Sequence, residues 1–281
     1  MVYDPLKVET YFDDYGEKEW ERLEETIQGR TKHRIHNWFL EKYLPAGSLK
    51  VLDAGCGPGR FSIDLAYRGA NLTLADISRK QLDLAEHHLE EEGLLARVKA
   101  FHHLDITDMQ VLDDDAFDAV VCYGSTLSYT FDQHETALKE LIRVLKPGGS
   151  LFLSVSSLMG TLRLVGPLDA NYFLEDPDDH LDWDSVLSGG GVVLTRPGSK
   201  EFHLPLALFS SGGLRNLLEK FGLKLRGMAT ANPLVPQGTK TPNIEDSPEA
   251  CEALSLLEQA ACSSPGLLDS GEHLLAAAEK R

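Results

Sequence analysis

The fold is decided by the stretch Val51-Leu52-Asp53-Ala54-Gly55-Cys56-Gly57-Pro58-Gly59. This stretch predicts a buried strand that runs into a glycine turn, with a helix that begins near Arg60. Glycine takes positive φ without a Cβ penalty and lets the backbone approach a ligand closely. A helix N-terminus then directs unpaired N–H groups at whatever occupies the turn. We therefore expect a strand–turn–helix unit that binds a ligand.

A second acid indicates which ligand. The predicted strand Leu72-Thr73-Leu74-Ala75-Asp76 ends in Asp76, 17 residues after the last glycine of the turn. An acid at this point suits a bidentate contact with ribose hydroxyls. In the dinucleotide fingerprint G-x-G-x-x-G, counted from Gly55, the sixth residue would be glycine, but it is Arg60. The third glycine falls one residue early and Asp53 precedes the turn, which argues against a nicotinamide dinucleotide.

The pattern acid-x-Gly-x-Gly-x-Gly resembles the first motif of class I S-adenosylmethionine (SAM) methyltransferases. Three later segments match that family in order. They are the third-strand acid in His103-Leu104-Asp105-Ile106, the fourth strand Phe117-Asp118-Ala119-Val120-Val121-Cys122, and the turn before the fifth strand, Leu145-Lys146-Pro147-Gly148-Gly149. The resemblance covers about residues 48–156, and the chain looks like the broad group of small-molecule methyltransferases that includes glycine and ubiquinone-type enzymes.

The resemblance implies SAM as the cofactor and assigns its contacts. The glycines pass the backbone under the methionine part of SAM, and the acid before them orders the turn. Asp76 binds the ribose hydroxyls, and Asp105 accepts from the adenine amino group. An N-terminal tyrosine, Tyr15 or Tyr11, closes over the cofactor, and a basic residue pairs with its carboxylate. The expected cofactor-binding residues are Asp53, Gly55, Gly57, Gly59, Asp76, Ile77, Asp105, Ile106, Cys122, Tyr123, Tyr15 and Arg30.

Several of these residues also have a purely structural interpretation. Asp76 can serve as a helix N-cap, and Asp105 can be a solvated loop acid. Cys122 and Tyr123 suit a packed core. Arg30 suits the surface of an acidic helix. The sequence leaves these alternatives open.

The order of the segments predicts the fold class. Short apolar runs alternate with amphipathic helices between about residues 48 and 156, which favours a doubly wound parallel sheet. We expect an α/β fold with a seven-stranded, mostly parallel Rossmann-like sheet, an antiparallel last strand at His273–Ala278, N-terminal helices and a lid insertion. The expected organisation is an N-terminal helical cap at 1–47, a SAM-binding core at 48–156, a lid over the acceptor pocket at 157–209, and completion of the sheet at 210–281.

The composition excludes several partners. The net charge is −17, with 44 acids against 27 lysines and arginines and no basic stripe, so a nucleic-acid partner is not expected. The acidity favours solubility, and acids near the site would disfavour anionic substrates. The four cysteines lack metal or redox spacing, which favours a reducing compartment and no metal. Without a signal peptide or a membrane-length apolar run, we expect a cytoplasmic protein with no membrane partner.

The acceptor side is less defined. The segment Asp169–Asp184 mixes seven acids with Tyr172, Phe173 and Trp183 and has no lysine or arginine. Such a segment can bind a cationic amine by ion pairing and cation–π contact, or it can be a solvated acidic lid. His180 and His203 are candidate general bases for a hydroxyl acceptor, although a structural role suits either one.

The sequence thus predicts a SAM-dependent methyltransferase that acts on a small molecule by in-line transfer. An amine acceptor is slightly favoured, and O- or C-methylation stays open. The alternatives are a non-catalytic SAM-binding regulator and, more weakly, a nicotinamide-dependent oxidoreductase. The oligomeric state and the pathway are not encoded in any pattern that we found.

Overall fold

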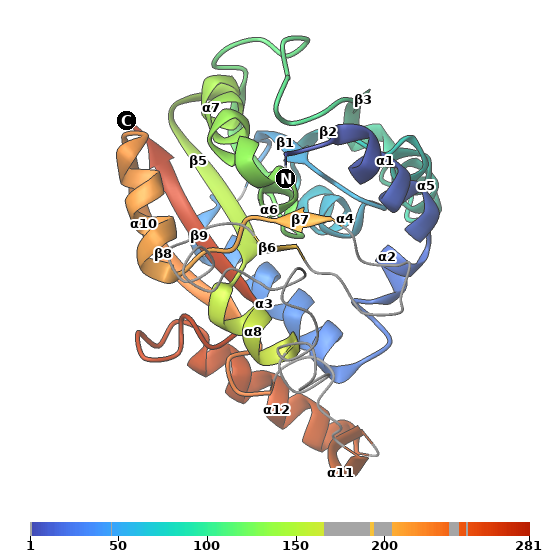
Figure 1. The fold of residues 1–281 in the computed structure, drawn as a ribbon. Coiled ribbons are helices and arrows are strands. Elements are labelled where there is room, and N and C mark those ends of the chain that lie inside the picture. Colours follow the sequence, from blue (N-terminus) through green and yellow to red (C-terminus); the bar gives the residue numbers. More distant parts are fainter. Residues whose placement is uncertain (1, 46, 166–191, 194–203, 236–241, 246) are drawn as a thin grey trace.

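One seven-stranded sheet organises the computed structural model, which describes residues 2–45, 47–165, 192–193, 204–235, 242–245 and 247–281. The strand order is β3-β2-β1-β4-β5-β9-β8. The strands are β1 Lys50–Ala54, β2 Asn71–Asp76, β3 Val98–His103, β4 Phe117–Cys122, β5 Leu145–Ser156, β8 Leu223–Ala231 and β9 His273–Lys280. The last strand, β9, is antiparallel to both of its neighbours, β5 and β8, and all other pairs are parallel. The predicted fold class is confirmed, including the position of the antiparallel strand (Figure 1).

Helices cover both faces of the sheet. The described helices of more than five residues are α1 Pro5–Tyr15, α3 Ile27–Tyr43, α4 Arg60–Tyr67, α5 Arg79–Glu91, α7 His134–Val144, α8 Leu158–Val165, α10 Ser211–Lys220 and α12 Pro248–Ala261. The short ones are α2 Lys18–Glu21, η1 Leu95–Arg97, α6 Thr126–Tyr129, η2 Phe131–Gln133 and α11 Pro242–Glu245. One hydrophobic cluster packs α7 and α10 on one face, and another packs α3, α4 and α5 on the opposite face.

Alternation along the strands divides the side chains between these two clusters. In β1, Leu52 and Ala54 belong to the cluster with α7 and α10, whereas Val51 belongs to the cluster with α3. In β5, Leu151 and Leu153 lie with the first cluster and Phe152 with the second. Successive strand residues point to opposite faces, and a parallel sheet covered on both sides is apolar on both. This explains the continuous apolar runs in the sequence.

The start of β5 corrects one expectation. Leu145–Gly149, expected as the turn before the fifth strand, is the first part of β5 itself. Leu145 already pairs with Phe117, and the next printed pair joins Ser150 to Ala119, so the residues between them form a bulge opposite Asp118. The Lys146 ammonium binds the Asp118 carboxylate at 2.6 Å and holds the bulge. The glycine pair therefore serves a strand irregularity rather than a separate turn.

The segment expected to be a lid is described only in part. Its described portions are α8, the two-stranded antiparallel pair β6 Val192–Val193 with β7 Pro205–Leu206, and the residues from 204 to 209. His180, His203 and the acidic stretch Asp169–Asp184 lie outside the described residues. The lid assignment thus stays a prediction.

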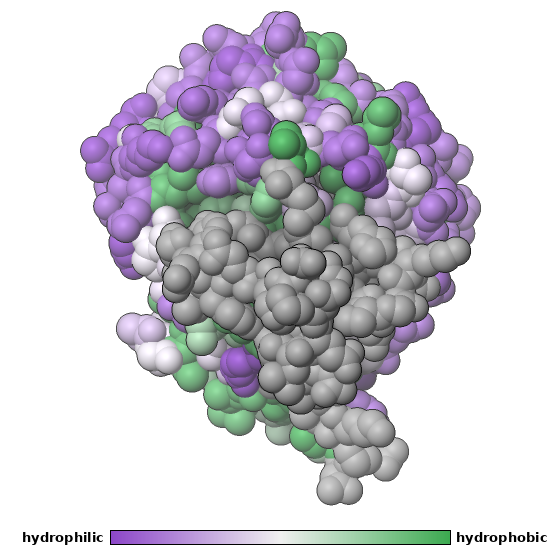
Figure 2. Space-filling view, in the orientation of Figure 1, coloured by the Kyte–Doolittle hydropathy of each residue, from purple (hydrophilic) through white to green (hydrophobic). Residues whose placement is uncertain are grey.

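The surface on the side drawn in Figure 2 is hydrophilic over most of its upper part. Hydrophobic residues are more frequent below, toward α12, on which Leu256 and Leu257 are exposed. Among the described residues, no helix combines the length and apolarity that a membrane span requires.

Candidate cofactor-binding site

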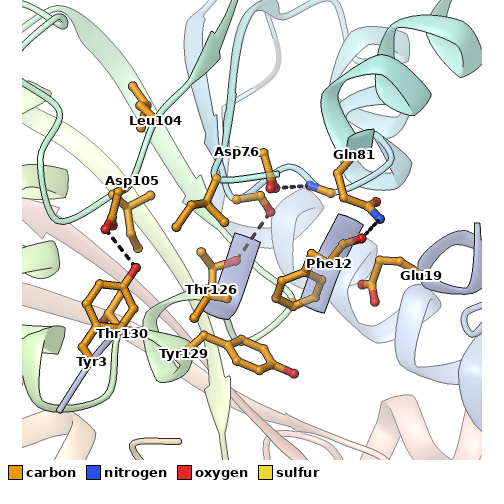
Figure 3. Close-up of a pocket in the computed structure, with 16 residues that line it drawn as sticks. Tyr3, Phe12, Glu19, Asp76, Gln81, Leu104, Asp105, Thr126, Tyr129 and Thr130 are labelled. Carbon is orange, nitrogen blue, oxygen red and sulfur yellow. Dashed lines mark hydrogen bonds between the residues drawn. The ribbon is translucent and has the colours of Figure 1, made fainter. Parts of the chain in front are cut away.

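A pocket lies at the carboxyl ends of β1, β2, β3 and β4, where a doubly wound sheet binds its ligands. Six of the residues expected to bind the cofactor line this pocket (Figure 3). They are Gly55, Gly57, Asp76, Ile77, Asp105 and Ile106. Residues 50 positions apart in the chain are therefore brought to one cavity by the strand order.

The glycine turn is fixed at its first glycine. The N–H groups of Gly55 and Cys56 both donate to the carbonyl oxygen of Ala75, at 2.7 and 3.1 Å, which ties the turn to β2. Gly55 has φ +76°, and a Cβ there would lie 2.2 Å from Oγ1 of Thr126. Gly55 is thus required by backbone conformation and by packing against α6.

At Gly57, unlike Gly55, the absence of a side chain leaves space in the pocket. It has φ +52°, and the nearest atom to a Cβ at this position would be Cγ of Glu19, 3.7 Å away. A side chain here would project into the pocket rather than into the core. Gly59, at φ +88°, precedes α4, and a Cβ there would lie 3.1 Å from Ala85 of α5; the pocket lining does not include Gly59. Gly59 allows close packing of α4 and α5, whereas Gly57 leaves room for a ligand.

Asp76 holds the turn from the end of β2. Its Oδ2 accepts from the Gly57 N–H and its Oδ1 from the Ser78 N–H, both at 2.8 Å. Burial raises the pKa of Asp76 to about 6. The N-cap of α5 is Ser78, whose hydroxyl accepts from the Gln81 N–H at 3.1 Å. The capping role that the sequence left open for Asp76 thus belongs to Ser78, and Asp76 faces the pocket.

Asp53 lies below the turn, in β1, and is 1% exposed. Its Oδ2 accepts from the Ser62 hydroxyl of α4 at 2.6 Å. Burial raises the pKa of Asp53 to about 7. The pocket lining does not include Asp53, so this acid acts on the turn from beneath, by joining β1 to α4.

Asp105 lies at the far end of the pocket, after β3. Its Oδ1 accepts from the Thr107 N–H at 2.8 Å, and its Oδ2 accepts from the hydroxyl of Tyr3 at 2.9 Å. Tyr3 lines the pocket, and its backbone N–H donates to Asp132 Oδ1 at 2.7 Å. Burial and the charge of Asp105 raise the pKa of Tyr3. Tyr3 was not among the expected residues, because nothing in the local sequence distinguishes it from a frayed terminus.

The N-terminal strap, defined here as residues 3–16, closes one side of the pocket with Tyr3, Val8 and Phe12. Gln81 of α5 holds it: its Nε2 donates to the carbonyl oxygens of Phe12 and Gly16, each at 3.0 Å. The Ser78 hydroxyl also donates to Asp13. Figure 3 shows Phe12 and Tyr3 directed into the same cavity as Asp76.

Besides Asp53 and Gly59, four more expected residues lie outside the pocket lining. Tyr15 stacks on Tyr11 with ring centroids 5.7 Å apart. Arg30 is exposed, and its Nη1 donates to the carbonyl oxygen of Glu24 at 2.7 Å. Cys122 and Tyr123 are fully buried, and burial raises the pKa of each. The Tyr123 hydroxyl has no hydrogen-bond partner among the described residues.

A different arginine lies beside the pocket. Arg22 forms an ion pair with Glu19, which lines the pocket. A Cβ at Gly124, another lining residue, would lie 3.8 Å from Nη2 of Arg22. The guanidinium therefore faces the turn after β4. Sequence reasoning missed it because the i,i+3 spacing of Glu19 and Arg22 is common on acidic helices.

Among the residues that the structure describes, no group of three or more histidines, cysteines or acids could hold a metal ion. The groups at and below the pocket are backbone N–H groups, two buried carboxylates and a positive-φ turn at the end of each of β1 and β4. These features define a nucleotide-type binding site in a doubly wound α/β protein.

Comparison with known proteins identifies the family. A model described as "Methyltransferase domain" matches residues 51–149. The chain is 32% identical over 170 residues to the ubiquinone biosynthesis O-methyltransferase of Pseudomonas aeruginosa, covering 58% of this chain and 68% of the relative. It is 31% identical over 157 residues to the glycine N-methyltransferase of Mus musculus, covering 50% of this chain and 53% of that protein.

A solved structure supports the same fold. The magnesium protoporphyrin IX methyltransferase of Synechocystis, with bound S-adenosylhomocysteine (SAH), matches with a TM-score of 0.60 at 16% identity, covering 99% of this chain and all of that one. The chain belongs to the class I SAM-dependent methyltransferases. It is an enzyme of that family, and SAM is its cofactor.

The pocket fits this cofactor. Gly57 and Gly124 both line the pocket at positive φ, and a Cβ at either would meet no atom closer than 3.7 Å, so both positions leave the space of a side chain open to a ligand. Asp76 presents a buried carboxylate at the same wall. Asp105 and Ile106 offer an acceptor and an apolar surface at the other end.

Proposed function

We propose that this enzyme transfers a methyl group to a small-molecule acceptor in line with the sulfur of SAM. The single observation that carries the proposal is the Asp76 carboxylate, buried at the pocket wall and joined to the turn at Gly57. The names of two relatives, an enzyme of ubiquinone biosynthesis and a glycine N-methyltransferase, support a small acceptor. The net charge of −17 disfavours a nucleic-acid acceptor.

Each end of the cofactor has a matching group. Asp76 suits the ribose hydroxyls, with Ile77 against the base, and Asp105 and Ile106 suit the adenine end. Gly55 and Gly57 keep the backbone low under the methionine end. Bound SAM supplies a methyl group that its sulfonium already activates, so the protein has to align the acceptor and exclude water. Alignment of this kind supplies several kcal/mol, up to roughly 7–11 in ideal cases.

Arg22 is our candidate partner for the cofactor carboxylate. It lies beside Gly124 at the methionine end of the pocket, and its planar guanidinium suits a bidentate contact with a carboxylate. Glu19 holds the guanidinium in place through their ion pair. Arg30, the residue expected from the sequence, donates to Glu24 on the exposed side of α3.

The four-part organisation belongs to the same proposal. The N-terminal cap at 1–47 carries the strap over the pocket, and the core at 48–156 carries the cofactor site. The segment 157–209 is our candidate cover for the acceptor, with His180, His203 and the acidic stretch within it. The segment 210–281 completes the sheet with β8 and β9.

The experiment is release of SAH, measured by mass spectrometry, from SAM in the presence of separate pools of amines, phenols, alcohols, carboxylates and carbon nucleophiles. We expect turnover in one pool. SAM binding, measured by calorimetry in parallel, separates a missing acceptor from a missing cofactor site. Confirmed SAM binding with no turnover in any pool would contradict methyl transfer to a small molecule and would support a SAM-binding regulator.

A further inference from the structure

A chain of four polar side chains lies beside the cofactor pocket, and the proposed function does not use it. His36 of α3, Ser154 of β5 and Ser125 after β4 are buried, and His273 begins β9. Nε2 of His36 lies 2.9 Å from Oγ of Ser154, which lies 3.1 Å from Nδ1 of His273. Nε2 of His273 then lies 3.3 Å from Oγ of Ser125. We call these four residues the histidine–serine relay.

A backbone carbonyl fixes the direction of every hydrogen bond in the relay. Nδ1 of His36 lies 2.8 Å from the carbonyl oxygen of Lys32, which can only accept, so Nδ1 carries the proton. Burial lowers the pKa of His36 to about 3, so the ring is neutral and its Nε2 accepts from Ser154. The Ser154 hydroxyl has no second proton and must accept from Nδ1 of His273. Nε2 of His273 is left with a lone pair directed at the Ser125 hydroxyl.

The strand order locates the relay on the acceptor side. Asp76 ends β2, and Asp105 and Gly57 follow β3 and β1, so the proposed cofactor site extends along the sheet edge from β3 toward β4. The next strands in that direction are β5 and β9. In-line transfer places the acceptor on the side of the methyl carbon opposite the sulfur, and we infer that this side faces the ends of β4, β5 and β9. Ser125 and His273 lie at these ends.

The backbone at Ser125 is held in an unusual conformation. Its φ is +66°, one of four positive values among the described non-glycine residues. Its N–H donates to the carbonyl oxygen of Ser154 at 3.1 Å, and its neighbours Gly124 and Thr126 both line the pocket. Conformations of this kind persist only where the surroundings fix them, and they cluster at functional sites. In this conformation the Ser125 hydroxyl lies 3.3 Å from Nε2 of His273, between two residues that line the pocket.

We propose that Ser125 and His273 remove the proton from a phenolic acceptor, an inference that rests on the proposed methyl transfer. Ser125 is the catalytic residue that contacts the acceptor hydroxyl, and His273 receives the proton through it. Ser154 and His36 are positioning residues, because they hold His273 in the tautomer whose Nε2 lone pair faces Ser125.

The proposed step transfers one proton and one methyl group. The acceptor hydroxyl gives its proton to Oγ of Ser125 while the Ser125 proton passes to Nε2 of His273. The acceptor oxygen forms a bond to the methyl carbon, and the electron pair of the broken carbon–sulfur bond goes to sulfur. The products are a methyl ether, a neutral thioether and the imidazolium of His273, which carries the positive charge that the sulfonium held.

The surroundings of His273 favour a phenol over an aliphatic alcohol. Burial, with the charges of Lys32 and Arg22 and the neighbouring ring of His36, lowers the pKa of His273 well below its ordinary value. Lys32 is paired with Glu272 at 2.5 Å, and the His36 ring also meets Tyr123 edge to face. Transfer of a proton to a weak base becomes less favourable as the pKa of the proton donor rises. A phenol is more acidic than an aliphatic alcohol, so His273 can accept a proton from a phenol more readily. A neutral amine would need no base at this position.

The first test is independent of activity. Nitrogen-15 spectra of the imidazole rings, recorded on the full chain without cofactor or acceptor, report the tautomer of each histidine. We expect His36 and His273 to be neutral and protonated on Nδ1 between pH 6 and 8. In Ser154→Ala, the proton of the neutral His273 ring should no longer be confined to Nδ1. Protonation of His273 on Nε2 in the wild type would overturn the relay.

The second test is kinetic and uses the phenol pool. Ser125→Ala and His273→Gln should each lower kcat about 100-fold at pH 7, which is within the usual contribution of a general base. SAM affinity should not change in either variant. His87→Gln, at an exposed histidine that pairs with Glu91, is the matched control and should retain wild-type turnover.

The pH profile separates a proton acceptor from a structural residue. Because the pKa of His273 is lowered, the wild-type imidazole is already neutral near pH 6, and kcat should be flat from pH 6 to 8. In His273→Gln, kcat should rise with pH as the phenol itself ionises. Parallel profiles for the two proteins, or wild-type turnover confined to the amine pool, would overturn the inference. Absence of turnover in every pool would instead contradict the proposed function, and the tautomer spectra would still decide the relay.

Discussion

The two halves of the sheet edge are built differently. The cofactor half, at the ends of β3, β2, β1 and β4, presents carboxylates and bare backbone N–H groups within short stretches of chain. The half that we assign to the acceptor, at the ends of β4, β5 and β9 and called the acceptor half below, presents hydroxyls and imidazoles whose hydrogen bonds join residues more than 100 positions apart. The cofactor half recognises a constant ligand, and the acceptor half belongs to this chain's own chemistry.

The difference has a physical reason. A glycine at positive φ or an acid at a strand end acts through its own backbone, so it can be placed by a local motif. The hydrogen-bonded chain that joins the two buried histidines forms only after α3, β5 and β9 have packed. The cofactor half is therefore set by short-range geometry and the acceptor half by tertiary burial. Four predictions examine this contrast.

The largest effect is expected from Asp76→Ala. The variant removes the buried carboxylate that we assign to two ribose hydroxyls. Hydrogen bonds to a charged group contribute about 1.5–3 kcal/mol each, so SAM affinity should fall about 100-fold or more. Calorimetry measures the affinity, and the exposed Asp83→Ala on α5 is the matched control. Near-native SAM affinity in Asp76→Ala would contradict the assignment of the ribose site to Asp76. Unchanged tautomers of His36 and His273 in the same variant would show that the two halves are independent.

Two glycine substitutions sharpen the cofactor half. Gly55→Ala combines a positive φ with a Cβ 2.2 Å from Thr126, so it should lower the free energy of unfolding by about 2–4 kcal/mol. Gly57→Ala has a similar φ and no clash, so its loss should be about 1 kcal/mol. Urea unfolding compares the two. SAM binding should nevertheless weaken in Gly57→Ala, by less than in Asp76→Ala, because its methyl group enters the pocket. Equal stability losses in the two variants would contradict the distinct roles.

Arg22 lies between the two halves, and its replacement should have a smaller effect. Arg22→Gln should weaken SAM binding about tenfold, since it removes one charged partner of a partly solvated carboxylate. Arg30→Gln is the control, because Arg30 is exposed and binds a backbone carbonyl. Binding isotherms compare the SAM affinity of the two variants. A larger loss in Arg30→Gln would favour the assignment made from the sequence.

Asp53→Asn should have the smallest effect, and its sign depends on pH. The folded pKa of Asp53, about 7, exceeds its unfolded value near 4, so the wild type loses stability as pH rises between these values. The variant lacks this titration. The melting temperature of Asp53→Asn minus that of the wild type should therefore be higher at pH 8 than at pH 5. Each kcal/mol by which the wild type loses stability should shift this difference by roughly 2–4 °C. A difference that does not change with pH would show that Asp53 is ionised in the folded protein.

Most of the fold was predictable because its signals are local. The turn after β1 and the acid that ends β2 followed from alternation and glycine chemistry, and the limits of β4 came from the family resemblance. The bulge in β5 did not, because Leu145–Gly149 has the composition of a turn and only the pairing of Leu145 with Phe117 makes it a strand. The position of β9 between β5 and β8 came from the family resemblance.

The candidate site divides in the same way. Asp76 was identified because it ends a recognisable strand, and Asp105 was identified through the family resemblance. Tyr3 and Arg22 were missed because their contacts, with Asp105 and with the turn at Gly124, depend on where the N-terminal segment crosses the sheet. His273 was read as the first residue of a strand. Its contact with Ser125 joins residues 148 positions apart, and no spacing pattern encodes such a contact.

The N-terminal strap has a consequence for timing. Tyr3 binds Asp105, the acid that we assign to adenine, and Gln81 fastens the strap at Phe12 and Gly16. We expect a nucleoside to exchange with this pocket after these bonds open, so that the opening frequency of the strap sets the exchange rate. Tyr3→Phe should accelerate both association and dissociation of SAH. The dwell time of the spent cofactor, rather than methyl transfer, would then limit each cycle.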